Sequence, residues 1–368
     1  MSGEVPPAAA DQGIRPVFVE NRKYIGSKTE LLGFIAQVVE SRAPEARSMA
    51  DLFCGSGVVA HHFAARGFRV TAVDNLYHNY LAARCFFGGK PGEVSWPEVA
   101  ERIAFLDRLP PAVGYCCREY GGRYFTPENA GRIDAIREQV ASWQAAGEIG
   151  DQMMAILVTS LIYAADKVAN TCGQYDAYLK HLGKTPYSPE GVHQVDANVY
   201  KRLTLGLPQV VETGLNQVFC GDANQLAAAV ECDLVYLDPP YNTRQYVDNY
   251  HVLENIARWE KPPLSGKTRK FRREHLKSSY SRRRSAAAAL AALIRQVRCR
   301  HILLSYNNEG IIPDEAILEM LAERGKVEVF TREYTIFGNG AGRSGRRPIQ
   351  ERLFYCQVLR PPVGDALQ

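Results

Sequence analysis

The chain lacks any run of apolar residues long enough to cross a membrane, and its N-terminus lacks the short apolar core of a secretory signal peptide. Its nine cysteines are scattered and odd in number, and none has the C-x-x-C spacing with paired histidines that a zinc site requires. No internal repeat of fixed period is visible in the sequence either. We therefore expect a cytoplasmic protein with reduced cysteines, no bound metal and no membrane partner.

What the chain does contain is an ordinary globular composition with one strongly basic stretch. Its 368 residues are 46% hydrophobic and 23% charged, which suits one catalytic domain with an insertion, or two domains. The net charge is only +4, yet residues 261–285 hold ten Lys or Arg side chains against the single acid Glu274. Such a run is typical of a loop that contacts a nucleic-acid backbone, although a solvated basic loop has the same composition.

A strand, a glycine turn, a helix and a second strand follow one another between residues 48 and 74. This order is typical of the first half of a doubly wound nucleotide-binding sheet, with Asp51 and Asp74 at the two strand ends. Gly55 and Gly57 let a ligand approach the turn closely, but Ala60 replaces the third glycine of a dinucleotide motif. An acid before the turn and no pyrophosphate motif favour a positively charged ligand, S-adenosylmethionine, with a purely structural turn as the alternative.

A later strand end carries the motif around which the chain is organised. The apolar run 233–237 stops at Asp238-Pro239-Pro240-Tyr241, which predicts a buried strand that opens into a rigid loop. The loop combines a carboxylate, the carbonyl of Pro239 and a flat tyrosine ring, and these groups suit a planar ring that bears an exocyclic amine. The simpler alternative is that the two prolines only end the strand.

The pattern of strands and helices divides the chain into a catalytic part and an insertion. Residues 1–16, rich in Ala, Pro and Gly, are predicted to form a disordered tail. The catalytic part is expected to comprise residues 17–90 and 216–360, with the basic loop 261–285 inside it. Residues 91–215 form the insertion, because the strand pattern lapses there and helical spacing replaces it. Its helices are predicted at 96–109, 129–146, 151–169 and 175–182.

Aromatic residues are interleaved among basic residues in the insertion, as a nucleic-acid surface would require, although a purely structural helical cap has a similar composition. These residues are Arg118, Arg123, Tyr124, Arg132, Arg137, Lys167, Tyr175, Tyr178, Lys180, His181 and Lys184. In the last part of the chain, strands at 327–337 and 351–359 are predicted to form a hairpin that adds an antiparallel edge to an otherwise parallel sheet.

Taken together, these blocks resemble the Dam-type amino-methylating DNA methyltransferases, and more closely the FokI-like adenine methylases of type IIS restriction-modification systems. The resemblance rests on Arg-Lys-Tyr-Ile-Gly-Ser-Lys at 22–28, Asp-Leu-Phe-Cys-Gly-Ser-Gly at 51–57, Asp-Pro-Pro-Tyr-Asn-Thr-Arg-Gln-Tyr at 238–246, and further blocks at 249–254 and 304–310. It implies an α/β fold with a doubly wound, mostly parallel seven-stranded sheet, the class I methyltransferase fold, and a largely helical target-recognition insertion. It also implies S-adenosylmethionine as donor and double-stranded DNA as substrate. A cognate restriction endonuclease is a possible partner, and an orphan enzyme is the alternative.

The resemblance also implies roles for individual residues. Tyr24 and Lys28 would be the N-terminal cofactor contacts, and Asp74 would bind the ribose. Asp222 would lie near the cofactor's adenine, although Ala223 follows it where relatives often have an aromatic residue. The full set of expected cofactor-binding residues is Tyr24, Lys28, Asp51, Phe53, Gly55, Gly57, Asp74, Asp222 and Asp238.

The expected reaction is methylation of the N6 amine of an adenine that has left the duplex. The catalytic residues would be Asp238, Pro239, Pro240 and Tyr241: the carboxylate and the Pro239 carbonyl accept the two amine hydrogens while Tyr241 stacks on the base. The alternatives are N4-cytosine methylation, methylation of RNA or of a protein glutamine, and a catalytically silent DNA-binding protein. The sequence carries no signal for the oligomeric state. The expected DNA contacts are Lys267, Arg269, Lys270, Arg272, Arg273, Arg282, Arg283, Arg284, Arg343, Arg346 and Arg347.

Overall fold

The computed structural model describes residues 14–179, 197–335 and 348–360. The chain divides into two compact units, each built from three separate stretches. The first unit takes residues 1–27, 77–214 and 247–274, and the second takes residues 28–76, 215–246 and 275–368. Arg343, Arg346 and Arg347 of the expected DNA contacts, and Lys180, His181 and Lys184 of the insertion, lie outside the described residues.

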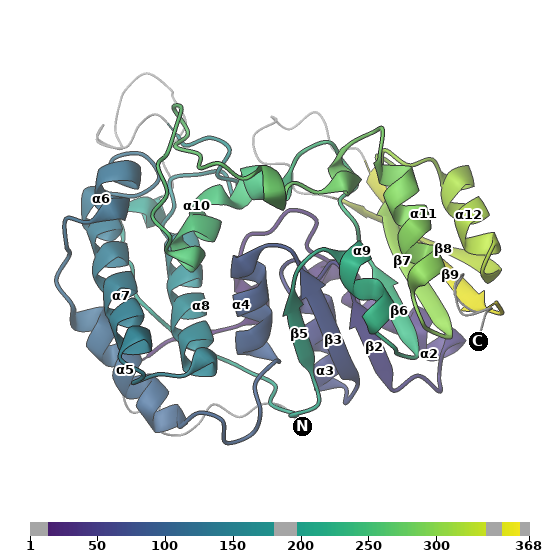
Figure 1. Cartoon of the computed structure of the whole chain (residues 1–368), viewed down its shortest axis with the longest axis horizontal. Coiled ribbons are helices and arrows are strands. Elements are labelled where there is room, and N and C mark those ends of the chain that lie inside the picture. Colours follow the sequence, from purple (N-terminus) through teal and green to yellow (C-terminus); the bar gives the residue numbers. More distant parts are fainter. Residues whose placement is uncertain (1–13, 180–196, 336–347, 361–368) are drawn as a thin grey trace. The chain divides into compact units, whose positions relative to one another are not determined.

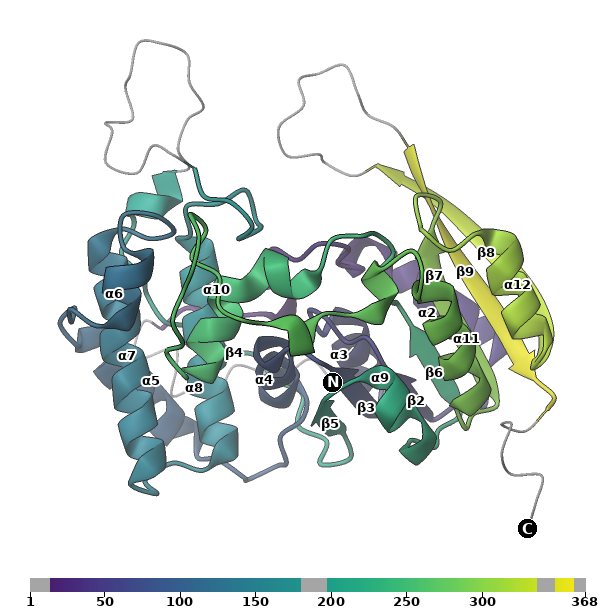
Figure 2. The ribbon, with the colours of Figure 1, turned by 45° about the horizontal axis from the view of Figure 1, so that its top comes forward.

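The second unit contains the predicted doubly wound sheet, which has seven strands among the described residues. Their order is β5-β3-β2-β6-β7-β9-β8, and the strands can be followed side by side in Figure 2. The five strands from β5 to β7 are parallel to one another. The strands are β2 (Ser48–Asp51), β3 (Arg69–Asp74), β5 (Gln217–Cys220), β6 (Leu234–Leu237), β7 (His301–Asn307), β8 (Gly325–Thr335) and β9 (Pro348–Val358). The predicted fold class is therefore confirmed.

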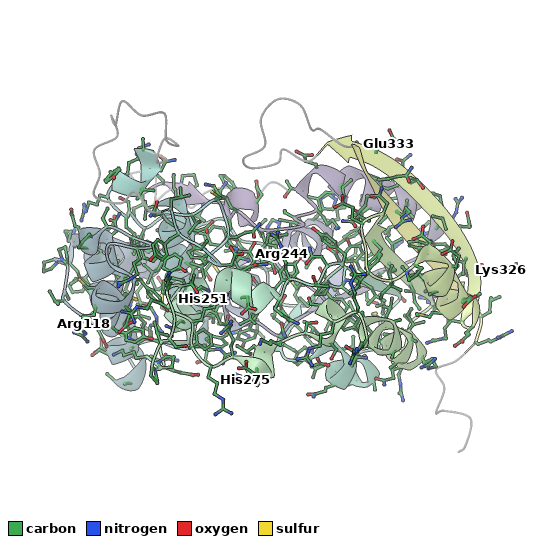
Figure 3. The ribbon with its side chains drawn as sticks, turned by 90° about the horizontal axis from the view of Figure 1, so that it is seen from above. Arg118, Arg244, His251, His275, Lys326 and Glu333 are labelled. Atoms are coloured by element: carbon green, nitrogen blue, oxygen red, sulfur yellow. The ribbon has the colours of Figure 1, made fainter. Side chains whose placement is uncertain are left out.

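The predicted closing hairpin is present, but its antiparallel strand is not at the edge. β9 pairs antiparallel with both β7 and β8, so the outermost strand β8 runs in the same direction as the parallel strands. Figure 3 shows Lys326 and Glu333 near opposite ends of β8. The register sets Glu351 of β9 beside Asn307 at the end of β7.

Helices cover both faces of this sheet. They are α2 (Leu32–Arg42), α3 (Val58–Ala65), α9 (Ala223–Leu226), α11 (Ala286–Gln296) and α12 (Asp314–Ala322). Along the sheet, the step from β2 to β3 goes toward the β5 edge, whereas the step from β6 to β7 goes toward the β8 edge. Because both crossovers are right-handed, α3 and α11 lie on opposite faces of the sheet. Figure 1 shows α11 and α12 on the near face.

The core under α11 explains why this segment is helical. Its sequence is rich in alanine, the strongest helix former, and Leu290, Leu293 and Ile294 form a buried stripe along one face. This stripe belongs to a core cluster with Val235, Leu237, Ile302, Leu304, Ile317, Leu321 and Phe354. The buried guanidinium of Arg324 donates to the carbonyls of Ile294 and Val297, which satisfies the carboxyl end of the helix.

The first unit is mainly helical (Figure 1). In its helix α8 (Asp151–Lys167), residues Gln152 to Asp166 are all buried, as expected for a helix surrounded by other elements. Its helices are α4 (Tyr77–Phe86), α5 (Trp96–Arg108), α6 (Tyr115–Tyr120), α7 (Pro127–Ala145), α8 (Asp151–Lys167) and α10 (Tyr246–Arg258). Two short strands, β1 (Pro16–Val17) and β4 (Leu207–Pro208), pair in parallel.

Two sequence predictions need correction here. The tail was expected to extend to residue 16, but Pro16 of β1 pairs with Leu207 of β4. The sequence shows no sign of this strand, because a two-residue strand is too short to show a periodic pattern. A helix was expected at 175–182, but the described residues 175–179 are irregular. The Tyr175 N–H donates to the Asn249 carbonyl at 2.7 Å, and the Asn170 side chain donates to the Leu179 carbonyl at 2.7 Å.

The remaining regular elements are short 3₁₀ helices: η1 (Val19–Asn21), η2 (Thr29–Leu31), η3 (Ala197–Tyr200), η4 (Ala227–Ala229), η5 (Glu274–Leu276) and η6 (Ser279–Ser281). Across the described parts of the chain, no helix combines the length and the apolar character that a membrane crossing would need.

Candidate active site

Three carboxylates gather at the carboxyl edge of the parallel sheet in the second unit. Asp51 and Asp74 are the last residues of β2 and β3, and Asp238 directly follows β6. These strands are neighbours, since β2 pairs with β3 on one side and with β6 on the other. The connections change direction between β2 and β6, and ligands of doubly wound sheets bind at such a point.

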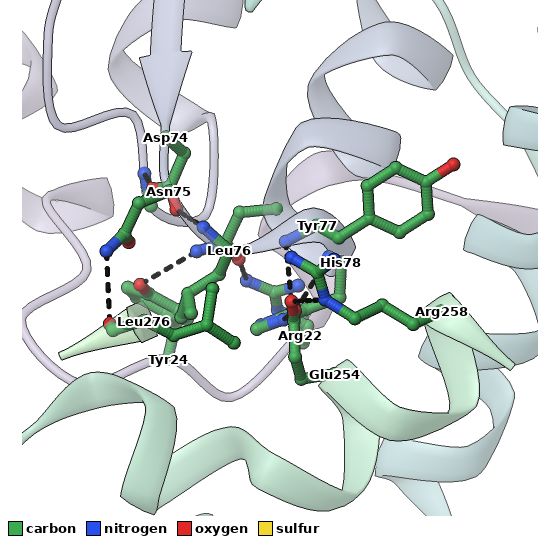
Figure 4. A network of polar contacts seen from close by, with 12 residues as sticks. Arg22, Tyr24, Asp74, Asn75, Leu76, Tyr77, His78, Glu254, Arg258 and Leu276 are labelled. Atoms are coloured by element: carbon green, nitrogen blue, oxygen red, sulfur yellow. Dashed lines mark hydrogen bonds and ion pairs between the residues drawn. The ribbon is translucent and has the colours of Figure 1, made fainter. Parts of the chain in front are cut away.

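The glycine turn after β2 is held by Asp74. One Asp74 oxygen accepts the Gly55 N–H at 2.8 Å, and the other accepts the Leu76 N–H at 2.8 Å. Gly55 and Gly57 have φ values of 55° and 84°, which a residue with a Cβ rarely adopts. Figure 4 shows Asp74 beside Leu76, with the Asn75 amide donating to the Leu276 carbonyl. The predicted ribose acid therefore also fixes the shape of the turn.

Lys28 brings the positive charge of this cluster. Its ammonium lies 3.1 Å from Asp238 Oδ1 and 3.2 Å from Glu351 Oε1, with only 5% of the lysine side chain exposed. The Asp238 side chain is 21% exposed, whereas Glu351 is buried. Burial raises the pKa of Asp238 to about 6; the Lys28 ammonium opposes this rise and the Glu351 charge adds to it. Asp238 is therefore an ionised acceptor at neutral pH that a ligand can reach.

Asp51 behaves differently because it is only 1% exposed. Burial and then the charges of Asp238 and Asp74 raise the pKa of Asp51 to about 8, although the Phe53 N–H donates to it at 3.3 Å. At neutral pH this carboxyl is mostly protonated. The edge of the sheet thus has more acids than the lysine can neutralise, so it favours a ligand with positive charge.

The residues after Asp238 form a well-supported loop. Pro239 is buried, and Tyr241 packs at the margin of the core cluster while part of its side chain remains exposed. The Ile311 N–H donates to the Tyr241 carbonyl at 3.0 Å, which ties the loop to the segment after β7. Phe53 lies near the same core, with its ring centroid 4.9 Å from that of Tyr280 in an edge-on arrangement.

Asp222 lies beyond Asp74 at the end of β5, since Asp74 and Cys220 are paired in register. One of its carboxylate oxygens caps α9 by accepting from Asn224 at 2.9 Å and Gln225 at 3.3 Å. The residue is exposed. It therefore has a structural role, and it also keeps a surface that a ligand can contact.

Tyr24 belongs to the first unit, unlike the other expected cofactor residues. Its ring stacks on Tyr250 with centroids 4.8 Å apart, and the Asn79 amide donates to its hydroxyl at 3.1 Å. The buried guanidinium of Arg22 lies 4.9 Å from the Tyr24 ring and also donates to Asn79. The orientation of Tyr24 is thus set by several neighbours.

Within the described residues, the expected DNA contacts fall into two groups, those paired with acids and those that are exposed. Arg269 pairs with Glu119 at 3.5 Å, and Lys270 and Arg273 both pair with Asp248. The exposed members are Lys267, Arg272, Arg282, Arg283 and Arg284. The basic stretch 261–285 is also not one element, because residues 261–274 belong to the first unit and residues 275–285 to the second.

Within the insertion, burial corrects part of the expected nucleic-acid surface. Arg132 and Arg137 are 2% and 4% exposed and donate to backbone carbonyls, including Leu203 and Ile256. Tyr124 and Tyr175 are fully buried. These side chains hold the helices and loops of the first unit together and are not available to DNA.

Two features were missed by the sequence interpretation. Glu351 contacts the Lys28 ammonium and accepts from the Ser305 hydroxyl; the only sequence signal was an acid at the start of an apolar strand. The first unit also has a cavity of about 460 Å³ whose lining includes Arg15, Lys23, Lys167, Lys201 and Arg202. They come from three separate stretches of the sequence, so no local pattern could have predicted their convergence.

Comparison with known proteins places the chain in a family. A family model described as D12 class N6 adenine-specific DNA methyltransferase matches residues 24–320. The type II methyltransferase M.NlaIII of Neisseria lactamica is 34% identical, and the match covers 91% of this chain and 98% of the relative. Modification methylase StsI of Streptococcus sanguinis is 33% identical and type II methyltransferase M.FokI of Planomicrobium okeanokoites 32%, over 91% and 84% of this chain. The matches span about half of those two longer relatives, 52% and 48% of their lengths. The chain belongs to the D12 class N6 adenine-specific DNA methyltransferase family.

Proposed function

We propose that the protein transfers a methyl group from S-adenosylmethionine to the N6 amine of a flipped adenine in a short double-stranded DNA site. The family establishes N6-adenine DNA methylation, so N4-cytosine and RNA targets are no longer needed as alternatives. The donor, the residues that bind it and the catalytic residues are proposals. The observation that carries them is the partly exposed Asp238 carboxylate on a proline-supported loop at the direction change of the sheet.

The carboxyl edge of the sheet fits the proposed donor. When bound, S-adenosylmethionine supplies a methyl group on a positively charged sulfur. Asp51, Asp74 and Asp238 give the edge an excess of acids. Gly55 and Gly57, whose positive φ values favour glycine, present no Cβ to a ligand at their positions in the turn. The residues proposed to hold the donor are Tyr24, Lys28, Asp51, Phe53, Gly55, Gly57, Asp74, Asp222 and Asp238.

The work of the protein on the amine is to orient it and to raise its reactivity. The N6 lone pair of adenine is delocalised into the ring, which makes this amine a weak nucleophile. The Asp238 carboxylate and the Pro239 carbonyl would accept its two hydrogens, which localises the lone pair on nitrogen. Tyr241 would stack on the base and offset part of the cost of unstacking it from the duplex.

The direct test is Asp238→Ala with methyl transfer to DNA as the measurement. We expect activity to fall by about 10³-fold, as when an oriented hydrogen-bonding group is removed, while the donor still binds in calorimetry. Glu231→Gln, an exposed acid before the same strand, is the matched control and should leave activity unchanged. Near-normal transfer by Asp238→Ala would show that another group orients the amine.

We further propose that the enzyme is the modification partner of a restriction endonuclease. The names of the relatives support this, since they are type II methyltransferases and modification methylases. The DNA substrate and nine free thiols agree with a cytoplasmic location. Expression in a methylation-free host, followed by sequencing of the modified genome, would identify the base and the site together.

A further inference from the structure

Lys28 is shared between two carboxylates at almost equal distances. Its ammonium is 3.1 Å from Asp238 and 3.2 Å from Glu351, and the lysine side chain is 5% exposed. The two acids differ in access, because Asp238 is 21% exposed and Glu351 only 1%. A ligand can therefore reach the Asp238 side of this bridge, whereas the Glu351 side is closed.

Glu351 is held by regular structure. It lies on β9 between Asn307 of β7 and Arg332 of β8 in the strand register. The Ser305 hydroxyl, also on β7, donates to Glu351 Oε1, the oxygen that faces Lys28. The position of this carboxylate is thus fixed by two neighbouring strands and a hydrogen bond.

The proposed chemistry creates a conflict at Asp238. Its Oδ1 already interacts with the ammonium, yet the carboxylate must accept a hydrogen of the substrate amine. An ammonium that lost its carboxylate inside the protein would be strongly destabilised. A second carboxylate in contact from the start removes that penalty, because the ammonium can move away from Asp238 and remain paired.

We propose that Glu351 is a positioning residue for methyl transfer, which retains the Lys28 ammonium when the substrate amine engages Asp238. The proposal rests on the assignment of Asp238 in the proposed function. Glu351 does not touch the reacting atoms. It acts through Lys28, and it keeps the Asp238 carboxylate available to the amine.

The charge of Glu351 also affects the pH dependence of Asp238. Several titratable groups lie near this bridge. Asp51 on β2, Tyr236 on β6 and Tyr241 in the loop after β6 interact electrostatically with Asp238, and Glu309 after β7 interacts with Tyr241. Glu351 acts to raise the pKa of Asp238, and Lys28 acts to lower it. Removal of the Glu351 charge alone should therefore lower the pKa of Asp238.

The test is Glu351→Gln, which keeps the shape and removes the charge. We expect kcat to fall about 100-fold, the scale of a misplaced catalytic group, while the affinity for S-adenosylmethionine changes less than threefold. The acid limb of kcat/KM should move to lower pH. Glu351→Asp, which keeps the charge, should retain more activity and leave the limb at the wild-type position. If Glu351→Gln does not fold, Glu351→Asp still tests the inference, because an acid limb that moved in this charge-preserving variant would contradict it.

Glu328→Gln on the adjacent strand β8 is the matched control, because this acid is half exposed and pairs with Arg42. It should leave kcat and the pH profile unchanged. A Glu351→Gln enzyme with wild-type kcat, or with reduced kcat and an unmoved acid limb, would overturn the inference. Either result would concern Glu351 alone. The proposed function would still be supported if the wild type is active and Asp238→Ala is inactive.

Discussion

At the residue scale, three carboxyls of this protein, two of them buried and Asp238 partly exposed, differ widely in acidity because their neighbours differ. The pKa is about 8 for Asp51, about 6 for Asp238 and about 2 for Glu254. Burial acts to raise all three. Asp51 has acids beside it and Asp238 has one lysine, whereas Glu254 accepts from His78 and Arg258 at 2.7 and 2.6 Å.

Asp51 should release a proton when the donor binds. At pH 7 its carboxyl is mostly protonated, and a positively charged ligand lowers its pKa by favouring the ionised form. We expect release of up to about one proton per site, measured by calorimetry in buffers of different ionisation enthalpy. This proton release should disappear at pH 9, because Asp51 is already ionised there. It should also be absent at pH 7 in the variant Asp51→Asn, which has no carboxyl at this position. Uptake of a proton at pH 7 would contradict the assignment.

At the element scale, Glu254 joins α10 to the start of α4 within the first unit. Its carboxylate accepts the backbone N–H groups of Tyr77 and His78 at 2.9 and 3.1 Å, as Figure 4 shows. A negative charge at a helix N-terminus satisfies its free donors and interacts favourably with the helix dipole. Burial lowers the pKa of His78, so its neutral ring donates through Nδ1.

Glu254→Ala should destabilise the protein by about 3 kcal/mol, because it leaves two backbone donors and His78 without their acceptor. Thermal unfolding measures this. The contribution should be fully present above the ordinary pKa of 4.5 and be lost as the pH falls toward about 2, since the folded-state pKa is lowered. Glu260→Gln is the matched control: Glu260 contacts the same Arg258 at 3.8 Å but is 66% exposed, so the change should be within about 0.5 kcal/mol.

At the scale of the whole molecule, the distribution of exposed cations should govern DNA affinity. Arg282, Arg283 and Arg284 are exposed just before α11, whose N-terminus adds a favourable field for phosphate. Replacing all three by alanine should weaken binding to every sequence alike. It should also reduce the slope of log affinity against log salt by about 2 to 3. Arg295→Ala, at the other end of α11 and paired with Glu323, should change neither quantity. An unchanged slope in the triple variant would make this segment a solvated loop.

Sequence order predicted most of the sheet, because each strand end carried a local signal such as the glycine turn or Asp238-Pro239. It also predicted the family, which the match over residues 24–320 confirms. It could not predict which cations are neutralised by acids. Arg273, for example, pairs with Asp248, which is distant in sequence and approaches it only in the folded chain. The role of Glu351 was hidden for the same reason, since Lys28 lies at the opposite end of the chain.

The interleaving of the chain has a consequence for anyone who wishes to exchange the predicted target-recognition insertion. The units are assembled from six alternating segments, so neither is a contiguous piece that could be cloned or exchanged alone. A graft of residues 91–215 from a relative would leave residues 247–274 of the recipient in the same unit. Such a chimera would lose native hydrogen bonds, such as that from Arg137 to the Ile256 carbonyl, unless both segments were transferred together. Exchange of the insertion should therefore be attempted with matched segments from one source protein.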